Sequence, residues 1–176
     1  MDYLMSKKCE VDEHSRWSLD DIRVLLAQGV CFLLTAITSK TMGKPDTVSE
    51  QELRNKHIGI KLQTMAMVHS AYYSYNSFRE AIVMEKDERV KIILEQLCKL
   101  FGINMVLAHC GTIAGGAFIT KEQIATLKML KEELLAKLRP NLMGIVDGFG
   151  IPDKFIRSAL ISGNPYEVLL WRRRII

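Results

Sequence analysis

The sequence predicts an all-α fold: an up-and-down helical bundle of four principal helices with a short C-terminal helix packed across it. Apolar residues recur at intervals of three and four along the chain, which is the period of an amphipathic helix. Serine and threonine cap signatures stand before several of these stretches. No run of alternating β-branched residues bounded by tight turns occurs, so strands are not expected.

The first two helices are placed by their caps. The first is expected from Ser18 to about Ser39, because the Ser18 hydroxyl can accept a free backbone N–H at a helix start. A break at residues 43–46 precedes a second helix, expected from Ser49 to about Glu85. The second helix is apolar on more than one face, which predicts a central place in the bundle.

The third and fourth helices follow from spacing. The third begins after residues 85–87 and carries an apolar stripe of Val90, Ile93, Leu94, Leu97 and Phe101. The glycine-rich residues 111–116 are expected to end it as a loop. The fourth helix starts at Thr120, which opens a Thr-x-x-Gln cap, and is expected to continue with a kink at Pro140 to about Asp147.

With 176 residues, the chain suits one folding unit. Residues 1–17 are expected to be a flexible leader and residues 18–176 the helical domain, with the last helix from Tyr166 to about Arg173. The most apolar stretch, 24–37, is interrupted by Gln28 and is shorter than the roughly 20 residues that a bilayer span requires. A buried core helix is therefore expected there, and no membrane span.

Charge and cysteine usage exclude some classes of function. The net charge is +4 with both signs interspersed, so no nucleic-acid partner is expected, and Arg172–Arg174 is interpreted as a solvated helix end. The cysteines Cys9, Cys31, Cys98 and Cys110 have no CxxC spacing and are interpreted as reduced core thiols. Without a visible secretory leader, this predicts a reducing intracellular compartment such as the cytoplasm.

Neither a phosphate site nor a metal site is predicted. The glycines of residues 111–116 match no phosphate-cradling motif and follow a helix rather than a strand. His57, His69 and His109 lie in predicted helices, and only His109 has a possible ligand, Cys110, beside it. Adjacent helical residues point about 100° apart, so this pair cannot easily share a metal. His69 is expected to be hydrogen-bonded inside the bundle.

Two further groups favour packing over catalysis. Asp147 lies among Ile145, Val146 and Phe149, so it is expected to be buried with a hydrogen-bond partner rather than to act as a catalytic acid. The aromatic cluster at Tyr72, Tyr73, Tyr75 and Phe78 lacks flanking cations at helical spacing. It is therefore interpreted as core or subunit interface, not as a base-stacking surface.

Four segments, in order, together resemble a known family. These are Leu97–Ile103 (LCKLFGI), Phe118–Ile124 (FITKEQI), Ile145–Phe149 (IVDGF) after the leucine-rich Glu133–Arg139, and Gly163–Glu167 (GNPYE). They are similar to segments of the C-terminal helical region of peroxisomal acyl-CoA oxidases, in the acyl-CoA oxidase and acyl-CoA dehydrogenase-like superfamily.

The resemblance extends, more weakly, back to Ser18, and it has departures. Ser162 stands where the family often has Asp, Pro140 is unusual, and the sequence ends soon after Trp171 without a Ser-Lys-Leu signal. The resemblance implies a peroxisomal location, whereas the missing signal leaves the cytoplasm as the other expectation.

Members of that family use FAD to oxidise a fatty acyl-CoA to a trans-2-enoyl-CoA in fatty acid β-oxidation, and pass the electrons to oxygen as hydrogen peroxide. The resemblance implies that the catalytic glutamate, the β domain and most of the flavin site precede the matched region. No catalytic, cofactor-binding or metal-binding residue is therefore expected in this sequence, and the isolated chain is expected to be inactive and without a cofactor.

What the resemblance implies instead is a scaffold that supports the dimer. The expected partners are the remaining domains or the second subunit of an acyl-CoA oxidase, in a homo- or hetero-oligomer. A second hypothesis is a non-enzymatic interaction protein that kept the bundle and uses its freed packing surface for another partner.

Overall fold

The computed structural model describes residues 17–45 and 47–151, and in these residues every regular element is helical, with no strand. This confirms the predicted all-α class and its four principal helices. The chain divides into two compact units, Met1–Leu138 and Arg139–Ile176. The predicted leader up to Arg16 and the predicted last helix at Tyr166–Arg173 lie outside the described residues.

Helix α2 (Leu19–Met42) begins with a reciprocal cap, as predicted. The Ser18 hydroxyl accepts the Asp21 N–H at 3.1 Å, and the Asp21 carboxylate accepts the Ser18 N–H at 2.7 Å. By length and composition, α2 is the one helix among residues 17–45 and 47–151 that could cross a membrane. Half of its most apolar stretch is buried inside the protein, which is consistent with the predicted core helix.

The second predicted helix is divided in the structure. Helix α3 (Glu50–Glu52) is followed by a π-helical segment, η1 (Leu53–Ile58), and then by the long helix α4 (Gly59–Met84). A Cβ atom on Gly59 would lie 2.7 Å from the Arg54 carbonyl oxygen, so the wide turn ends on a residue that has no side chain.

Helix α5 (Glu88–Ala108) carries the predicted third stripe, but the glycine-rich stretch after it is not the loop that was predicted. Residues Cys110–Gly115 form one further short helix, α6. The buried Ile113 anchors α6, and Gly29 of α2 lies against it, with 3.3 Å from a Gly29 Cβ position to Ile113 Cγ1. The glycine content of residues 111–116 does not reveal this contact between α6 and α2, because it depends on residues that are distant in sequence.

Helix α7 (Lys121–Leu138) starts where its cap predicts. The Thr120 hydroxyl accepts the Gln123 N–H at 3.2 Å, and the Gln123 side-chain oxygen accepts the Thr120 N–H at 2.9 Å. This satisfies two backbone groups that a helix start otherwise leaves without an intrahelical partner.

In the second unit, a 3-10 turn, η2 (Arg139–Asn141), precedes helix α8 (Leu142–Asp147). The sequence predicts one helix that continues through Pro140 with a kink to Asp147, whereas the structure divides it into α7, η2 and α8, because proline has no N–H for the preceding turn.

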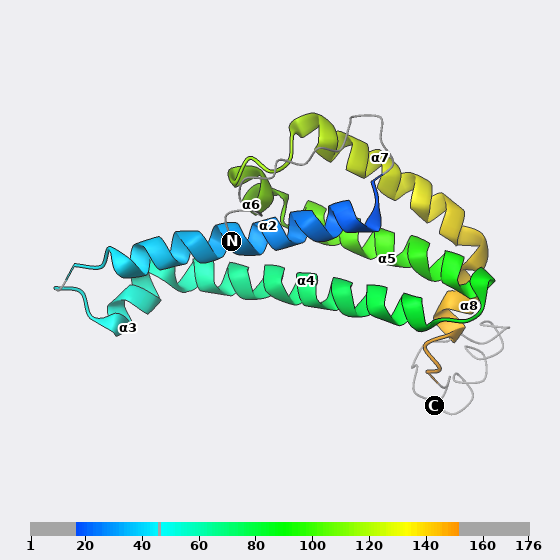
Figure 1. Cartoon of the computed structure of the whole chain (residues 1–176), viewed down its shortest axis with the longest axis horizontal. Helices are drawn as coiled ribbons and strands as arrows, with labels where there is room; N and C mark the ends of the chain where they lie inside the picture. The colour runs from blue at the N-terminus through cyan, green and yellow to red at the C-terminus, as the bar shows by residue number, and fades with distance from the viewer. Residues whose placement is uncertain (1–16, 46, 152–176) are drawn as a thin grey trace, which may run out of the picture. The chain divides into compact units, whose positions relative to one another are not determined.

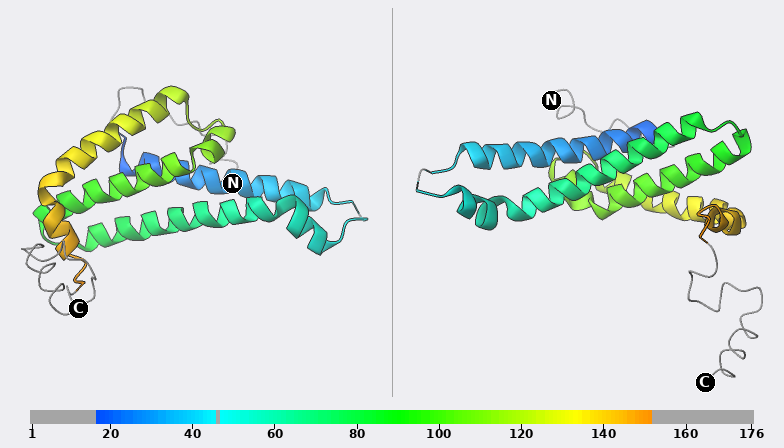
Figure 2. Two further views of the ribbon diagram at one scale, coloured as in Figure 1. Left: turned by 180° about the vertical axis from the view of Figure 1, so that it is seen from behind. Right: turned by 90° about the horizontal axis from the view of Figure 1, so that it is seen from below.

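The first unit packs as successive neighbours: α2 against α4, α4 against α5, and α5 against both α2 and α7 (Figures 1 and 2). Its main core draws on all of these helices, and it also includes Trp17, which the sequence had placed in the leader. A second, smaller core fills the far end of the α2–α4 pair, with Ile37, Leu53 and Ile58 buried together.

Candidate functional site

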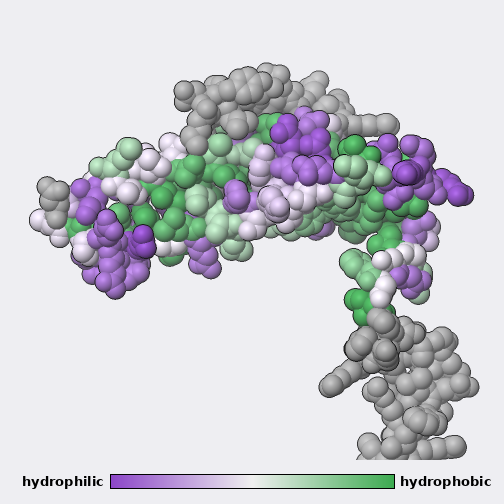
Figure 3. Space-filling view, turned by 60° about the horizontal axis from the view of Figure 1, so that its bottom comes forward, coloured by the Kyte–Doolittle hydropathy of each residue, from purple (hydrophilic) through white to green (hydrophobic). Residues whose placement is uncertain are grey.

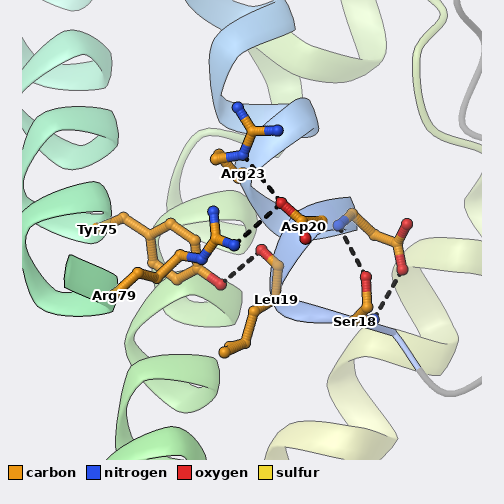
Figure 4. Close-up of polar contacts among 7 residues, drawn as sticks. Ser18, Leu19, Asp20, Arg23, Tyr75 and Arg79 are labelled. Carbon is orange, nitrogen blue, oxygen red and sulfur yellow. Dashed lines mark hydrogen bonds and ion pairs between the residues drawn. The ribbon is translucent and has the colours of Figure 1, made fainter. Parts of the chain in front are cut away.

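Several polar contacts of the first unit lie together where the start of α2 meets α4 (Figure 4). One carboxylate oxygen of Asp20 accepts hydrogen bonds from Arg23 Nε at 3.1 Å and from Arg79 at 3.0 Å. Partial burial raises the pKa of Asp20, but the hydrogen bonds and charges of the two arginines together outweigh it and hold the pKa below its ordinary value. The Asp20 side chain is 65% exposed, so this network is a surface clasp of modest strength.

Beside the Asp20–Arg23–Arg79 clasp, Tyr75 of α4 is fully buried, and its hydroxyl donates to the Leu19 carbonyl oxygen at 2.9 Å (Figure 4). Burial raises the pKa of Tyr75, so the phenol stays protonated and remains a donor at neutral pH. A buried phenol needs such an acceptor. The contact therefore ties the middle of α4 to the first turn of α2.

Helix α5 packs against Tyr75 through Gly102 and Cys98. A Cβ atom on Gly102 would lie 2.5 Å from Tyr75 Cε2 and 2.6 Å from Ile22 Cγ2, so only glycine lets the three helices approach this closely. One turn earlier, the buried Cys98 thiol contacts the Tyr75 hydroxyl, and burial raises the thiol pKa to about 11. Cys98 is therefore a protonated packing residue, not a nucleophile.

An open cavity of about 300 Å³ lies beside the clasp. Its polar lining is contributed by Asn76, Arg79 and Glu80 of α4 and by Lys91 and Glu95 of α5. Its lining contains two cations and two carboxylates, so it presents no net charge to a charged ligand. In residues 17–45 and 47–151, no three His, Cys, Asp or Glu side chains come together as metal ligands.

The predicted place of His69 is wrong. His69 is exposed, because it lies on the side of α4 away from the buried Val68, Ala71 and Tyr75. His57 is also exposed, at the π-helical segment. His109 is half-buried at the end of α5, and its burial lowers its pKa.

The predicted burial of Asp147 is also wrong. Asp147 is exposed, and so are its apolar neighbours Val146 and Phe149. Apolar neighbours in sequence gave it no apolar surroundings in space, because the short helix α8 exposes most of its residues.

The aromatic cluster is divided between two roles. Tyr75 belongs to the main core, and Tyr72 and Phe78 pack against that core, as predicted for packing residues. Tyr73 is 68% exposed on the opposite side of α4. The thiols of Cys98, Cys31 and Cys110 are free, with Cys98 buried and the other two half-buried, whereas Cys9 lies outside the described residues.

These features define a class of protein: an all-α bundle domain in which polar side chains cap α2 and α7 and fasten α4 to α2. A family model described as acyl-CoA oxidase matches residues 18–172. The chain belongs to the acyl-CoA oxidase family.

Curated relatives agree with this membership. The chain is 26% identical over 166 residues to peroxisomal acyl-coenzyme A oxidase 1 of Pongo abelii, covering 90% of this chain and 24% of that protein. It is 27% identical over 118 residues to the Bos taurus protein of the same name, covering 65% of this chain and 18% of that protein. The chain thus spans about a quarter or less of the length of these relatives.

A solved structure shares the fold. Arabidopsis thaliana acyl-CoA oxidase 1 superposes with a TM-score of 0.86 at 19% identity, over 97% of this chain and 26% of that one. The segment Leu97–Ile103, on which the sequence resemblance partly rests, contains Cys98 and Gly102, the two residues of α5 that pack against Tyr75. The segment Gly163–Glu167 lies outside the described residues.

Proposed function

We propose that this chain is the C-terminal helical region of an FAD-dependent acyl-CoA oxidase, and that it serves as scaffold and dimer support. The catalytic glutamate and most of the flavin site belong, in this proposal, to parts of the enzyme outside the region matched here. The parent enzyme would oxidise a fatty acyl-CoA to a trans-2-enoyl-CoA and reduce oxygen to hydrogen peroxide. Peroxisomal location comes from the names of the curated relatives.

The observation that carries the scaffold role is the use made of the polar side chains. Tyr75 fastens α4 to α2 through the Leu19 carbonyl, and Arg79 does the same through Asp20. Both contacts join the first turn of α2 to α4, and the buried one at Tyr75 is the stronger restraint. A rigid bundle of this kind suits a domain against which others pack.

The described residues fit a flavin dinucleotide poorly. The cavity beside the clasp is open, and its lining of two cations and two carboxylates offers no net positive charge to a pyrophosphate. The glycine-rich residues 110–115 form a short helix after another helix, without the preceding strand on which dinucleotide-binding loops depend.

The experiment combines a cofactor assay with a binding assay on the purified 176-residue chain. After incubation with FAD and gel filtration, we expect no retained flavin absorbance and no palmitoyl-CoA-dependent peroxide. Immobilised chain should capture a full-length peroxisomal acyl-CoA oxidase, and should not capture an unrelated helical protein of similar net charge. Peroxide production above that of free FAD would falsify the inactive part of the proposal.

The alternative, a non-enzymatic interaction protein, is favoured by the large apolar side chains that the bundle exposes, among them Met42, Ile60 and Met84. It predicts a stable complex with a protein unrelated to oxidases and no capture of an oxidase. The binding assay therefore separates the two functions.

A further inference from the structure

The far end of the α2–α4 pair projects beyond the other helices of the first unit (Figures 1 and 2). It is built from the last turn of α2, from α3 and η1, and from the first turn of α4. The smaller core described above joins these segments, and Lys40 Nζ of α2 donates to the His57 carbonyl oxygen of η1 at 3.4 Å. Residues 40–61 therefore form one structural end, here called the basic tip.

The basic tip carries an excess of positive charge. Residues 40–61 contain five lysines and arginines against three acidic residues, and this surplus of two is half of the net charge of the whole chain. One of the acidic side chains, Glu52, already accepts a hydrogen bond from Lys56 at 2.8 Å. Figure 3 shows this end on the left, as in Figure 1, with hydrophilic residues (purple) beside hydrophobic ones (green). The five cations are Lys40, Lys44, Arg54, Lys56 and Lys61.

Two large apolar side chains lie among these charges. Met42, the last residue of α2, is 84% exposed, and Ile60, in the first turn of α4, is 83% exposed. These are the two highest exposures among the large apolar side chains of residues 17–45 and 47–151. Neither side chain belongs to the smaller core beside it. Because apolar side chains gain free energy by leaving water, the tip offers a partner both positive charge and apolar surface.

Shape and composition favour a lipid surface over other anionic partners. The tip is the projecting end of a helix pair, so it can reach a flat surface more readily than it can enclose a small anion (Figure 1). Residues 33–71 contain no Phe, Tyr or Trp, so the aromatic side chains on which unpaired bases stack are lacking there. An anionic bilayer, by contrast, offers charged headgroups to the cations and an acyl region to Met42 and Ile60.

We propose that the basic tip docks on a membrane surface that contains anionic lipids. The exposed Lys40 and Arg54 contact headgroups, while Met42 and Ile60 enter the boundary between headgroups and acyl chains. Each cation near such a surface strengthens binding roughly fivefold, so a surplus of two predicts weak, reversible and salt-dependent association. The chain lies on the bilayer in this inference and does not span it. The inference is independent of the scaffold role proposed above.

Helix α7 provides a comparison within the same chain. Residues 121–139 carry the same surplus, with five lysines and arginines against three acidic residues. The most exposed large apolar side chain of α7, Met129, is 65% exposed, and α7 packs along α5 instead of projecting from the bundle. Charge alone would make the two regions equivalent, whereas the inference assigns lipid binding to the tip.

The test is co-sedimentation of the full 176-residue chain with vesicles of phosphatidylcholine, alone or with about 30 mol% phosphatidylserine. The parent chain should pellet with the anionic vesicles only, and raising the NaCl concentration from about 0.1 to about 0.5 M should release most of it. Arg54→Glu changes the charge of the tip by two and should weaken binding at least about tenfold. The matched control, Lys128→Glu on α7, makes the same change of charge and should bind within about twofold of the parent.

A second pair of variants tests the apolar contribution. Met42→Ser combined with Ile60→Ser leaves the charge of the tip unchanged and should weaken vesicle binding at least about tenfold, because both side chains leave water on docking. The control combines Met129→Ser with Leu135→Ser, two exposed positions of α7, and should bind as the parent does. Far-UV circular dichroism of each variant checks that the helices are intact.

Three outcomes would overturn the inference: a parent chain that stays in the supernatant with anionic vesicles, an equal loss of binding in Arg54→Glu and Lys128→Glu, or full binding by the folded Met42→Ser and Ile60→Ser double variant. A single-stranded oligonucleotide that binds the tip as tightly as the vesicles do would also overturn it, since the tip would then be a general site for polyanions. None of these results depends on capture of a full-length oxidase, so the proposed function is tested separately.

Discussion

Replacing Gly102 by alanine tests whether the close approach of three helices holds the main core together. The added Cβ atom would lie 2.5 Å from Tyr75 Cε2 and 2.6 Å from Ile22 Cγ2, well inside ordinary contact distance. Tyr75 cannot easily move aside, because it is fully buried and its hydroxyl is bonded to the Leu19 carbonyl. Either the ring leaves that acceptor or α5 moves away from α4.

The magnitude follows from two opposing terms. Overpacking a well-filled core by one methyl group costs up to about 3 kcal/mol. Alanine in a helix interior regains about 1 kcal/mol relative to glycine. Gly102→Ala should therefore lower the free energy of unfolding by about 2 kcal/mol, which is a large share of the 5–15 kcal/mol typical of a domain.

The assay is urea unfolding followed by far-UV circular dichroism, with the midpoint and slope fitted for each variant. Gly111→Ala is the matched control, since a Cβ atom there meets no atom within 4 Å, and it should be neutral or stabilise by up to about 1 kcal/mol. If Gly102→Ala were as stable as the parent, the packing of α5 against Tyr75 would have to be looser than described.

Three smaller perturbations test the same junction. Tyr75→Phe removes the hydrogen bond to the Leu19 carbonyl and should cost about 1 kcal/mol in urea unfolding; an unchanged midpoint would mean that water replaces the phenol without loss. Asp20→Asn should cost less than about 1 kcal/mol at pH 7, because the pair is exposed. Because the pKa of Asp20 is lower in the folded chain, its contribution to the free energy of unfolding is fully present above the ordinary pKa near 3.9. That contribution is lost as the pH falls through the pKa of the folded chain, so parent and variant should differ at pH 7 and converge in acid. Burial raises the pKa of Cys98 to about 11, so the thiol should resist iodoacetamide at pH 8 in the folded chain and react in urea, as measured by peptide mass spectrometry. Rapid labelling of the folded chain would contradict the burial of Cys98 against Tyr75.

Local signals in the sequence predicted local structure well. The caps at Ser18 and Thr120 were placed correctly, because a cap depends on residues three positions apart and little else. Pro140 disturbs its helix for the equally local reason that its nitrogen carries no hydrogen, but the structure divides the helix there, whereas a continuous kinked helix was predicted.

Burial was harder to predict, because it depends on which face of a helix meets another helix. His69 and Asp147 were expected inside the protein and are exposed, since neither lies on a face that the bundle covers. In the sequence, Gly102 stands out only as part of the segment Leu97–Ile103. Its reason lies in Tyr75 and Ile22, which are distant in sequence and meet it only in the folded chain.

The number of residues in the π-helical segment, Leu53–Ile58, decides whether Leu53 reaches the small core at the far end of the α2–α4 pair. A π turn accommodates one residue more than an α turn, so deleting a residue there would restore ordinary helical phase. Everything after Gly59 would keep its orientation, while Leu53 would rotate by about 100° out of the pocket that it shares with Ile37 and Ile58. Leu53 therefore stays buried only while the extra residue is present. A deletion at this end of the helix would change the small core and leave the packing around Tyr75, which belongs to the main core, as it is.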